Sequence, residues 1–478
     1  MKDDFNAVVI GGGSAGLVSA LIAAAVKAKV ALIEQDKMGG DCLNTGCVPS
    51  KALIKTARFI HEMKRHKELG IRSVSYDFDF KEVMDRVHRK IADIAPHDSV
   101  ERFTGLGVHC FLGKGEILDP QSVKVNDQVL KTRNIILAQG AEPFVPPIKG
   151  LNDISILSSE NLWKLSALPK KLVVLGGGPI GCELAQAFAR LGSTVQQVEM
   201  LPRILIREDE DVSALINEHM TRDGVEILCD TKANEVKLDS GKKILICEHQ
   251  GKTKELEFDE ILVAVGRKAR TAGTPWSDLN IKLRPNGTIQ VDPYLCANGS
   301  NIYAAGDITG PYQFTHTASH QAYYATVNAL FRPIKFKANY RVVPWVTYTD
   351  PEVAQVGLNE QSAKEQGIPH QVTKYDLDDL DRAITESEAH GFVKVLTDPK
   401  SRHGKILGAT VVAHGGGEIN SEFVAAMQHG FGLNQILGTI HPYPTMSEAN
   451  KFAAGIWKKT QIKPWIMSLL SRFHSWRR

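Results

Sequence analysis

Two cysteines separated by four residues are the side chains of this chain best suited to chemistry. They are Cys42 and Cys47, in a run that begins at Gly40 and ends at Lys51. Thiols at this spacing can close a small disulfide, and a disulfide differs from its dithiol by two electrons. Pro49 then marks where a helix can take over. The pair is therefore a candidate two-electron switch.

Two other interpretations fit the spacing alone: an ordinary buried disulfide, or two unrelated thiols. The chain opens Met-Lys-Asp-Asp-Phe-Asn and enters an apolar strand without a secretory signal, so we expect a cytoplasmic protein. A lasting structural disulfide is rare in a reducing cytosol, which favours catalytic or metal-binding use. The remaining cysteines show no ligand spacing, so we expect them to be buried small hydrophobic residues and expect no resident metal. They are Cys110, Cys182, Cys229, Cys247 and Cys296.

The elements around the cysteines follow one pattern that occurs twice. In each copy an apolar strand leads into Gly-x-Gly-x-x-Gly and a helix, and a second strand ends on a glutamate at the same distance from the third glycine. Such glycines let a pyrophosphate approach the backbone at a helix N-terminus, and the carboxylate accepts from ribose hydroxyls. Two copies predict two dinucleotide sites. The first copy comprises Gly11, Gly13, Ser14, Ala15, Gly16 and Glu34. The second comprises Gly176, Gly178, Ile180, Gly181 and Glu199.

The composition is that of a core-forming protein with about three domains, since 478 residues are 43% hydrophobic and 23% charged. A net charge of +3 is too small to indicate nucleic-acid binding. No stretch is apolar for long enough to cross a bilayer. The Pro/Gly-rich run 140–150 is expected to link the two copies, and the strand 301–305 with Asp307 at its tip to return to the first domain. From about residue 342 the pattern predicts an α+β domain, with strands at 394–396 and 406–412 and a helix at 419–428.

The C-terminal segment 456–478 is basic and aromatic. It has no acidic residue, and its cations alternate with tryptophan, leucine and phenylalanine. That composition is typical of a helix lying in a membrane interface. A helix packed on its own subunit or on a partner fits equally well, and the sequence leaves both open.

The motif Gly40-Asp-Cys42-x4-Cys47-Val-Pro-Ser-Lys51 resembles that of the class I pyridine nucleotide–disulfide oxidoreductases, the flavin-dependent family of dihydrolipoamide dehydrogenase, glutathione reductase and mercuric reductase. The resemblance runs from Ala7 to about Ala454. It implies an α/β enzyme with an FAD domain, an inserted NAD(P) domain and an α+β dimerisation domain. It also implies one FAD per subunit and a homodimer with a shared active site. The expected boundaries are 1–147 and 270–338 for the FAD domain, 148–269 for the NAD(P) domain, 339–455 for dimerisation and 456–478 for the tail.

The resemblance also implies roles for single residues. Cys42 matches the interchange thiol, which exchanges with substrate, and Cys47 the charge-transfer thiol beside the flavin. Lys51 matches a lysine near the reactive flavin nitrogen, whose charge would stabilise reduced flavin, and Glu183 the glutamate that pairs with it. Asp307 matches the acid at the ribityl or phosphate region. The expected FAD contacts are those of the first glycine loop with Gly40, Lys51, Gly140 and Asp307, and the NAD contacts are those of the second loop with Gly266.

The nicotinamide preference follows from one carboxylate. Glu199 stands where a ribose 2′-hydroxyl would bind, and it would repel a 2′-phosphate, so NADH is expected over NADPH. Arg203 and Arg207 follow closely and could still neutralise a phosphate.

One part of the chain departs from the dithiol-reducing members. Their dimerisation domain carries His-Pro-Thr-x-x-Glu, whose histidine acts as acid/base at the partner's thiols. Counted back from Glu448, that position holds Tyr443, as in mercuric reductases, and a phenol is a poor base at neutral pH. His441, two residues earlier and followed by proline, remains the rival candidate.

Three functions stay open. The favoured hypothesis is a mercuric reductase-like enzyme that transfers electrons between a nicotinamide and a disulfide or soft metal ion, since soft ions select sulfur. However, no cysteine follows Cys296, so the delivery pair of mercuric reductases is missing. The alternatives are a dihydrolipoamide dehydrogenase of a 2-oxoacid complex, and a membrane-associated flavoprotein that reduces a quinone or protein partner.

Overall fold

The computed structural model describes residues 4–478 and divides into two compact units. The first comprises the chain up to Lys64, Ser73–Met200 and Thr231–Asn339. The second comprises Arg65–Arg72, Leu201–Asp230 and Tyr340–Arg478. The expected domain boundaries within these units remain predictions.

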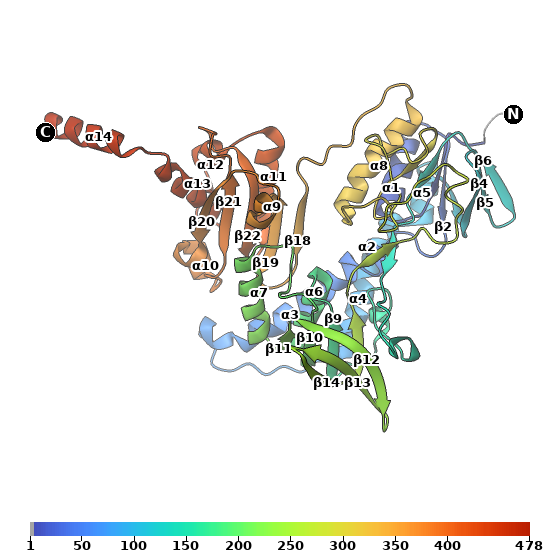
Figure 1. The fold of residues 1–478 in the computed structure, drawn as a ribbon, viewed down its shortest axis with the longest axis horizontal. Coiled ribbons are helices and arrows are strands. Elements are labelled where there is room, and N and C mark those ends of the chain that lie inside the picture. Colours follow the sequence, from blue (N-terminus) through green and yellow to red (C-terminus); the bar gives the residue numbers. More distant parts are fainter. Residues whose placement is uncertain (1–3) are drawn as a thin grey trace. The chain divides into compact units, whose positions relative to one another are not determined.

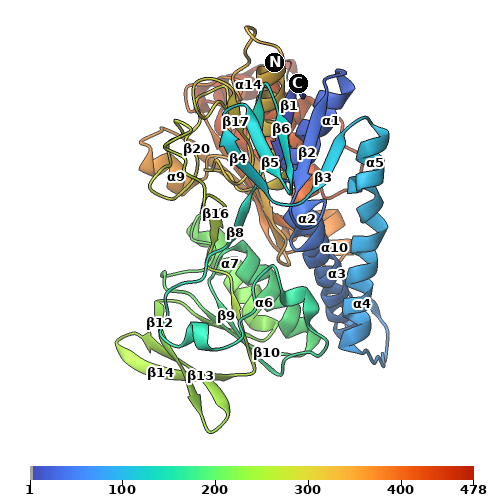
Figure 2. The same cartoon turned by 90° about the vertical axis from the view of Figure 1, so that its right-hand side faces the viewer.

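The first unit contains a five-stranded parallel sheet in the order β17-β7-β1-β2-β3. Its strand β2 is labelled in Figure 1, and β1, β3 and β17 are labelled in Figure 2. Its strands are mostly buried apolar runs, as expected for a parallel sheet covered on both faces. The late strand β17 pairs with β7, so the chain returns to its first sheet as the sequence predicts. The strands are β1 (Ala7–Ile10), β2 (Val30–Glu34), β3 (His109–Leu112), β7 (Ile135–Leu137) and β17 (Ile302–Ala304).

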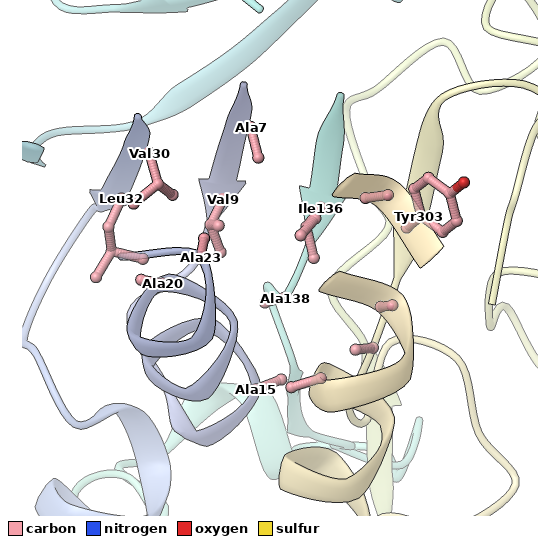
Figure 3. Close-up of a cluster of buried hydrophobic side chains, with 14 of the residues drawn as sticks. Ala7, Val9, Ala15, Ala20, Ala23, Val30, Leu32, Ile136, Ala138 and Tyr303 are labelled. Atoms are coloured by element: carbon pink, nitrogen blue, oxygen red, sulfur yellow. The ribbon is translucent and has the colours of Figure 1, made fainter. Parts of the chain in front are cut away.

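Helices α1 (Ser14–Ala25) and α8 (Thr315–Leu330) pack against each other and on this sheet (Figure 3). The buried faces of both helices are rich in alanines, such as Ala20 and Ala322, which let the backbones pack closely in this core. The tight packing fixes the N-terminus of α1 directly after the first glycine loop. Helices α3 (Cys47–Lys64) and α4 (Phe80–Ile94) lie side by side in the same unit (Figure 2).

The second glycine loop follows the central strand of another parallel sheet, ordered β10-β9-β15, and leads into α6. These elements are β9 (Lys171–Leu175), α6 (Pro179–Leu191), β10 (Thr194–Val198) and β15 (Glu260–Val263). The rest of the first unit consists of short helices and small antiparallel sheets. The sheets are β4 (Gly115–Asp119), β5 (Ser122–Val125) and β6 (Gln128–Lys131); β8 (Ala141–Pro143) with β16 (Arg267–Ala269); and β12 (Thr231–Asp239), β13 (Lys242–His249) and β14 (Lys252–Phe258). The short helices are α2 (Gly40–Asn44) and α5 (Val100–Gly105).

An antiparallel sheet of order β18-β19-β22-β21-β20 forms the second unit, with helices against it. Its core includes Trp457, whose ring packs on Gly404, so the start of the predicted basic tail belongs to this core. The strands are β18 (Pro344–Thr347), β19 (Glu352–Gly357), β20 (Gln371–Asp376), β21 (Phe392–Thr397) and β22 (Ile406–Ala413), with β11 (Val225–Leu228) elsewhere in the unit. The helices are α7 (Glu210–Arg222), α9 (Glu360–Glu365), α10 (Asp381–Thr385), α11 (Gly416–His429), α12 (Leu433–Gly438), α13 (Glu448–Thr460) and α14 (Pro464–Arg477).

Across residues 4–478, every helix is too short or too polar to cross a bilayer.

Candidate active site

The two cysteines lie on consecutive short elements that the first glycine loop positions. Cys42 is in α2 and Cys47 is the first residue of α3. The turn into α2 needs glycine, because Gly40 has a φ of +55° and a Cβ there would lie 2.6 Å from Cα of Gly13. The side chain of Asn44 ties the turn together by donating to the carbonyl oxygen of Gly40 at 2.9 Å. Helix α2, which carries Cys42, thus begins in direct contact with the first glycine loop.

The structure holds both cysteines as thiols, and it makes them unequal. A hydrogen bond from Cys42 is the main influence that lowers the pKa of Cys47, an exposed residue, to about 6. The same bond, together with burial, raises the pKa of Cys42. Thr315, which sequence analysis did not single out, lies 3.5 Å from Sγ of Cys47 and also stabilises its thiolate. At neutral pH the pair is a thiolate at Cys47 and a thiol at Cys42.

We expect the hydroxyl or thiol at position 42 to control this asymmetry. Cys42→Ala removes the donor and should raise the pKa of Cys47 measurably, whereas Cys42→Ser retains a donor and should leave it lower. The ultraviolet thiolate absorbance of the reduced protein, titrated with pH, measures both variants. Equal pKa values in the two variants would contradict the hydrogen-bond explanation.

An ion pair connects α3 to α6. Nζ of Lys51 lies 2.8 Å from Oε2 of Glu183, and the glutamate is almost fully buried. The positive charge of Lys51 also helps to lower the pKa of Cys47. The lysine and glutamate named by the resemblance therefore meet, one turn after the cysteine.

Both glycine loops have the geometry that a pyrophosphate requires. A Cβ at Gly16 would lie 1.7 Å from the carbonyl oxygen of Gly11, and one at Gly181 would lie 2.2 Å from that of Gly176. Gly13 precedes α1 without a side-chain cap, as the corresponding glycine does in α6, so the first amides of both helices can bind a phosphate. The residues present fit FAD in the first loop and a nicotinamide dinucleotide in the second.

The glutamate that ends each second strand accepts a hydrogen bond from its own glycine loop. Oε2 of Glu34 accepts from the backbone N–H of Gly12, and Oε2 of Glu199 from that of Gly177, both at 2.5 Å. Each carboxylate is thus held at the loop, where a ribose would lie.

Gly178 offers a test of the second loop. A Cβ there would meet no protein atom within 4 Å, and its φ of −76° suits any residue. We therefore expect Gly178→Ala to leave folding and FAD content unchanged while weakening NADH binding at least about tenfold, because the methyl group fills the space of the pyrophosphate. Titration with NADH under anaerobic conditions measures this. Gly181→Ala, which must clash with the backbone, should instead lower stability.

Asp307 follows β17 in the sequence and lies near the positive charge of Arg267, a partner that the sequence did not reveal. Burial raises the pKa of Asp307 to about 6, although Arg267 opposes the shift from 3.8 Å. Arg267 also pairs with Asp41, next to Cys42. Gly140 and Gly266 both have positive φ, in the turns that follow β7 and β15. A partly protonated carboxyl at this position can donate to, as well as accept from, hydroxyl groups of a ligand.

The histidine and tyrosine of the second unit have different settings. The His441 side chain is only 5% exposed, and its Nε2 lies 3.0 Å from Oε1 of Glu422. Tyr443 is 70% exposed and donates to Asp381 at 2.8 Å, a bond that raises the pKa of the phenol. Glu448 is buried and accepts from the backbone N–H of Thr445 at 3.2 Å. The phenol of Tyr443 is therefore exposed at the surface, and the imidazole of His441 is not. The partners Glu422 and Asp381 were not predicted, because nothing in the local sequence marks them.

Comparison with known proteins identifies the family. Residues 5–322 match the pyridine nucleotide-disulphide oxidoreductase model, and residues 343–454 match the dimerisation domain of the same family. A mercuric reductase of Bacillus cereus is 32% identical over 94% of this chain and 71% of its own length. A dihydrolipoyl dehydrogenase of Chlamydia muridarum is 34% identical over 94% of this chain and 96% of its own.

Solved structures agree. The HOCl-induced flavoprotein disulfide reductase RclA from Escherichia coli superimposes with a TM-score of 0.84 at 27% identity, covering 95% of this chain and 100% of that one. LpdA from Mycobacterium tuberculosis gives 0.85 at 26% identity, over 94% and 99%. The predicted fold and enzyme class are confirmed, and the dimerisation domain supports a homodimer. The chain belongs to the pyridine nucleotide–disulfide oxidoreductases, a family of FAD-dependent enzymes.

Proposed function

We propose that this enzyme uses NADH to reduce a soft metal ion at the Cys42/Cys47 pair. Two separate observations carry the proposal: Cys47 is a thiolate, and in the second unit the phenol of Tyr443 is exposed while the side chain of His441 is buried and engaged by Glu422. A cytoplasmic location belongs to the proposal, because a pair that cycles through a disulfide needs a supply of NADH.

The electrons balance as follows. NADH gives up two electrons as hydride and leaves as NAD⁺, and the chemistry that FAD supplies when bound is to accept that hydride and pass its electrons to sulfur. The Cys42–Cys47 bond breaks, a proton is held on Cys42, and Cys47 keeps the negative charge. The dithiol then gives two electrons to one Hg²⁺, forming Hg⁰, or to two Cu²⁺, forming two Cu⁺. The disulfide re-forms and the single proton held on Cys42 leaves. Lys51 and Thr315 hold the thiolate of Cys47 in this cycle.

The identity of the group at position 443 favours a metal over lipoamide. Exchange between lipoamide and a dithiol needs a base that takes a proton at neutral pH. Tyr443 is poorly suited to that task, because its O–H donates to Asp381 and this bond raises the pKa of the phenol. Coordination of a soft metal ion by the thiolate needs no base to take a proton from the substrate.

Steady-state oxidation of NADH by the full-length holoenzyme tests the proposal, with Hg²⁺, Cu²⁺ and lipoamide as alternative acceptors. We expect turnover with a metal ion to exceed that with lipoamide. Tyr443→Phe should lower metal turnover about tenfold, and Tyr443→His should raise lipoamide turnover about 100-fold. Faster turnover of lipoamide than of either metal by the unaltered enzyme would favour the dihydrolipoamide dehydrogenase alternative.

We propose NADH as the reductant because the carboxylate of Glu199 would repel the 2′-phosphate of NADPH. Arg203, the nearest candidate for a 2′-phosphate, is engaged: it donates to the carbonyl oxygen of Glu208 at 2.7 Å and to Oε1 of Gln361 at 2.6 Å. This engagement supports the preference for NADH.

We expect Glu199→Gln to reduce the preference of the enzyme for NADH over NADPH. The amide still accepts from Gly177 but no longer repels a phosphate, so the ratio of kcat/KM for NADH to that for NADPH should fall about 10-fold or more. Initial rates with each nicotinamide measure it. An unchanged ratio would show that selectivity originates elsewhere.

A second proposal concerns α14: we propose that it attaches the enzyme to anionic membranes. None of its residues is buried. On a helix, Trp465, Leu469, Phe473 and Trp476 share one face, and Arg472 and the C-terminal arginines border or oppose it. An apolar face with basic neighbours is typical of interfacial helices.

Co-sedimentation with vesicles tests this proposal. Full-length enzyme should bind vesicles with anionic lipid and release them at high salt, and Trp465→Ser/Trp476→Ser should bind markedly less. Equal partition of both proteins would leave packing against the partner subunit as the role of α14.

A further inference from the structure

A group of histidines and carboxylates gathers at one end of the antiparallel sheet of the second unit. Asp350 precedes β19, Glu388 and His390 precede β21, and His414 directly follows β22. The strand register pairs the starts of β19 and β21 with the end of β22. Three loops distant in sequence therefore converge, which no spacing along the chain could reveal.

The donor atoms of three of these residues are close enough for shared coordination, and the fourth, His390, lies beside one of the three. One ligand atom each from Asp350, Glu388 and His414 lies within 4.8 Å of the others. Nε2 of His390 lies 3.2 Å from Oε2 of Glu388. Ligand atoms on a tetrahedral ion with bonds of about 2.0–2.1 Å are roughly 3.3 Å apart, so this pair already has the required separation. Rotation of the exposed His414 side chain can close the remaining gap.

The neighbours of the cluster orient its ligands. Nη1 of Arg65 lies 2.8 Å from Oε1 of Glu388, which leaves Oε2 directed at His390. The ring of His219 packs on that of His390, with centroids 4.6 Å apart, and holds the imidazole in place. Support of ligands by a second set of side chains is typical of metal sites.

We propose that Asp350, Glu388, His390 and His414 form a binding site for a divalent transition metal ion. The set contains imidazole and carboxylate ligands and no thiolate, which suits Zn²⁺ and Cu²⁺ better than it suits Hg²⁺, which prefers sulfur. The site is independent of the acceptor that the cysteine pair reduces.

Metal binding by a full-length, FAD-loaded variant with Cys42→Ser and Cys47→Ser tests the proposal, because the redox thiols then cannot bind the probe. We expect calorimetry with Zn²⁺ to show a site that weakens at least about tenfold in His414→Ala and more in His390→Ala/His414→Ala. His403→Ala, at another exposed histidine of the same unit, is the matched control and should bind as the parent does. Paramagnetic resonance with Cu²⁺ should show coupling to two imidazole nitrogens in the parent and to one in His414→Ala.

The result that overturns the proposal is equal Zn²⁺ affinity in the parent and in the double histidine variant, with both retaining the FAD absorbance of folded protein. If the double variant does not fold, the Cu²⁺ spectrum of the parent decides: a spectrum without imidazole nitrogen coupling rejects the site.

Discussion

Replacing Cys47 with serine is expected to lower kcat for metal or disulfide reduction at least about 10⁴-fold while FAD stays bound. An alcohol cannot close a disulfide with Cys42. Its pKa also lies far above the value of about 6 that the thiol environment gives Cys47, so the anion is lost as well. Stopped-flow and steady-state assays with NADH and Hg²⁺ or Cu²⁺ measure the loss.

Two controls separate loss of chemistry from loss of structure. Cys229→Ser, at a cysteine outside the site, should retain full activity. The Cys47→Ser enzyme should still oxidise NADH with a one-electron acceptor such as ferricyanide, which can take electrons from flavin without the thiols. Retained metal turnover in Cys47→Ser would reject the cysteine pair as the site of reduction.

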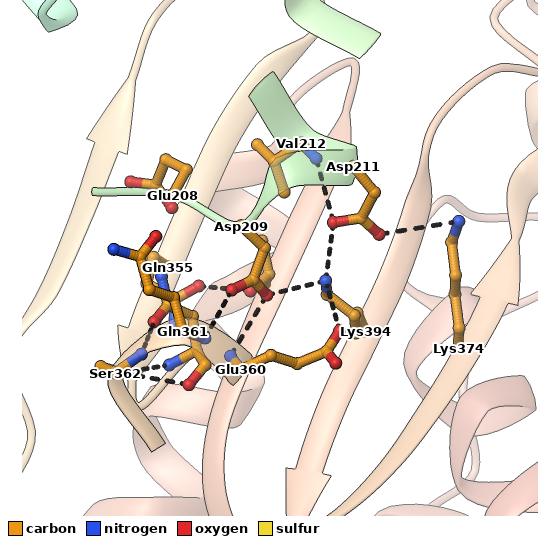
Figure 4. Close-up of polar contacts among 12 residues, drawn as sticks. Glu208, Asp209, Asp211, Val212, Gln355, Glu360, Gln361, Ser362, Lys374 and Lys394 are labelled. Atoms are coloured by element: carbon orange, nitrogen blue, oxygen red, sulfur yellow. Dashed lines mark hydrogen bonds and ion pairs between the residues drawn. The ribbon is translucent and has the colours of Figure 1, made fainter. Parts of the chain in front are cut away.

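Removing the charge of Lys394 is expected to destabilise the enzyme by about 3–5 kcal/mol, because the buried carboxylate of Asp209 is then left without its cation. The side chain is 2% exposed, and its Nζ lies 2.7 Å from Asp209, 2.7 Å from Asp211 and 2.9 Å from Glu360 (Figure 4). Burial acts to lower the pKa of Lys394, but the three carboxylates outweigh it and raise that pKa. The contribution is therefore complete at neutral pH and is lost only as the pH rises through the raised value.

Denaturant unfolding of Lys394→Met, followed by tryptophan fluorescence, measures the effect. Lys374→Met is the matched control, since Lys374 is 39% exposed and 3.9 Å from Asp211, and it should cost less than about 1 kcal/mol. Similar stabilities of the two variants would mean that the buried cluster is not coupled to folding.

The sequence predicts most of the elements that position the site, because their signals are local. Glycine spacing and apolar runs predict a strand before each glycine loop, where β1 and β9 lie, and a second strand leading to each glutamate, where β2 and β10 lie. The helix expected at 419–428 lies within α11. Lys51 and Glu183 are foreseen only through the family resemblance, as no local pattern joins them.

The partners that tune the site could not be predicted. Thr315 reaches Cys47 from another element, and Asp381 and Glu422 reach Tyr443 and His441 across the second unit. Such pairs depend on tertiary packing, which single-sequence periodicity does not encode. The burial of Trp457 could not be predicted either. Its basic, aromatic segment suggests an exposed tail, but Trp457 lies on the buried face of α13.

The two dinucleotide loops differ in one respect that bears on how the enzyme cycles. A Cβ at Gly13 of the first loop would contact Cα of Gly40 at 3.7 Å, whereas a Cβ at Gly178 of the second loop would have no protein atom within 4 Å. The first loop is thus the more enclosed of the two, and a ligand in an enclosed site dissociates more slowly than one in an open site. We therefore expect FAD at the first loop to stay through many turnovers and the nicotinamide at the second to leave in each.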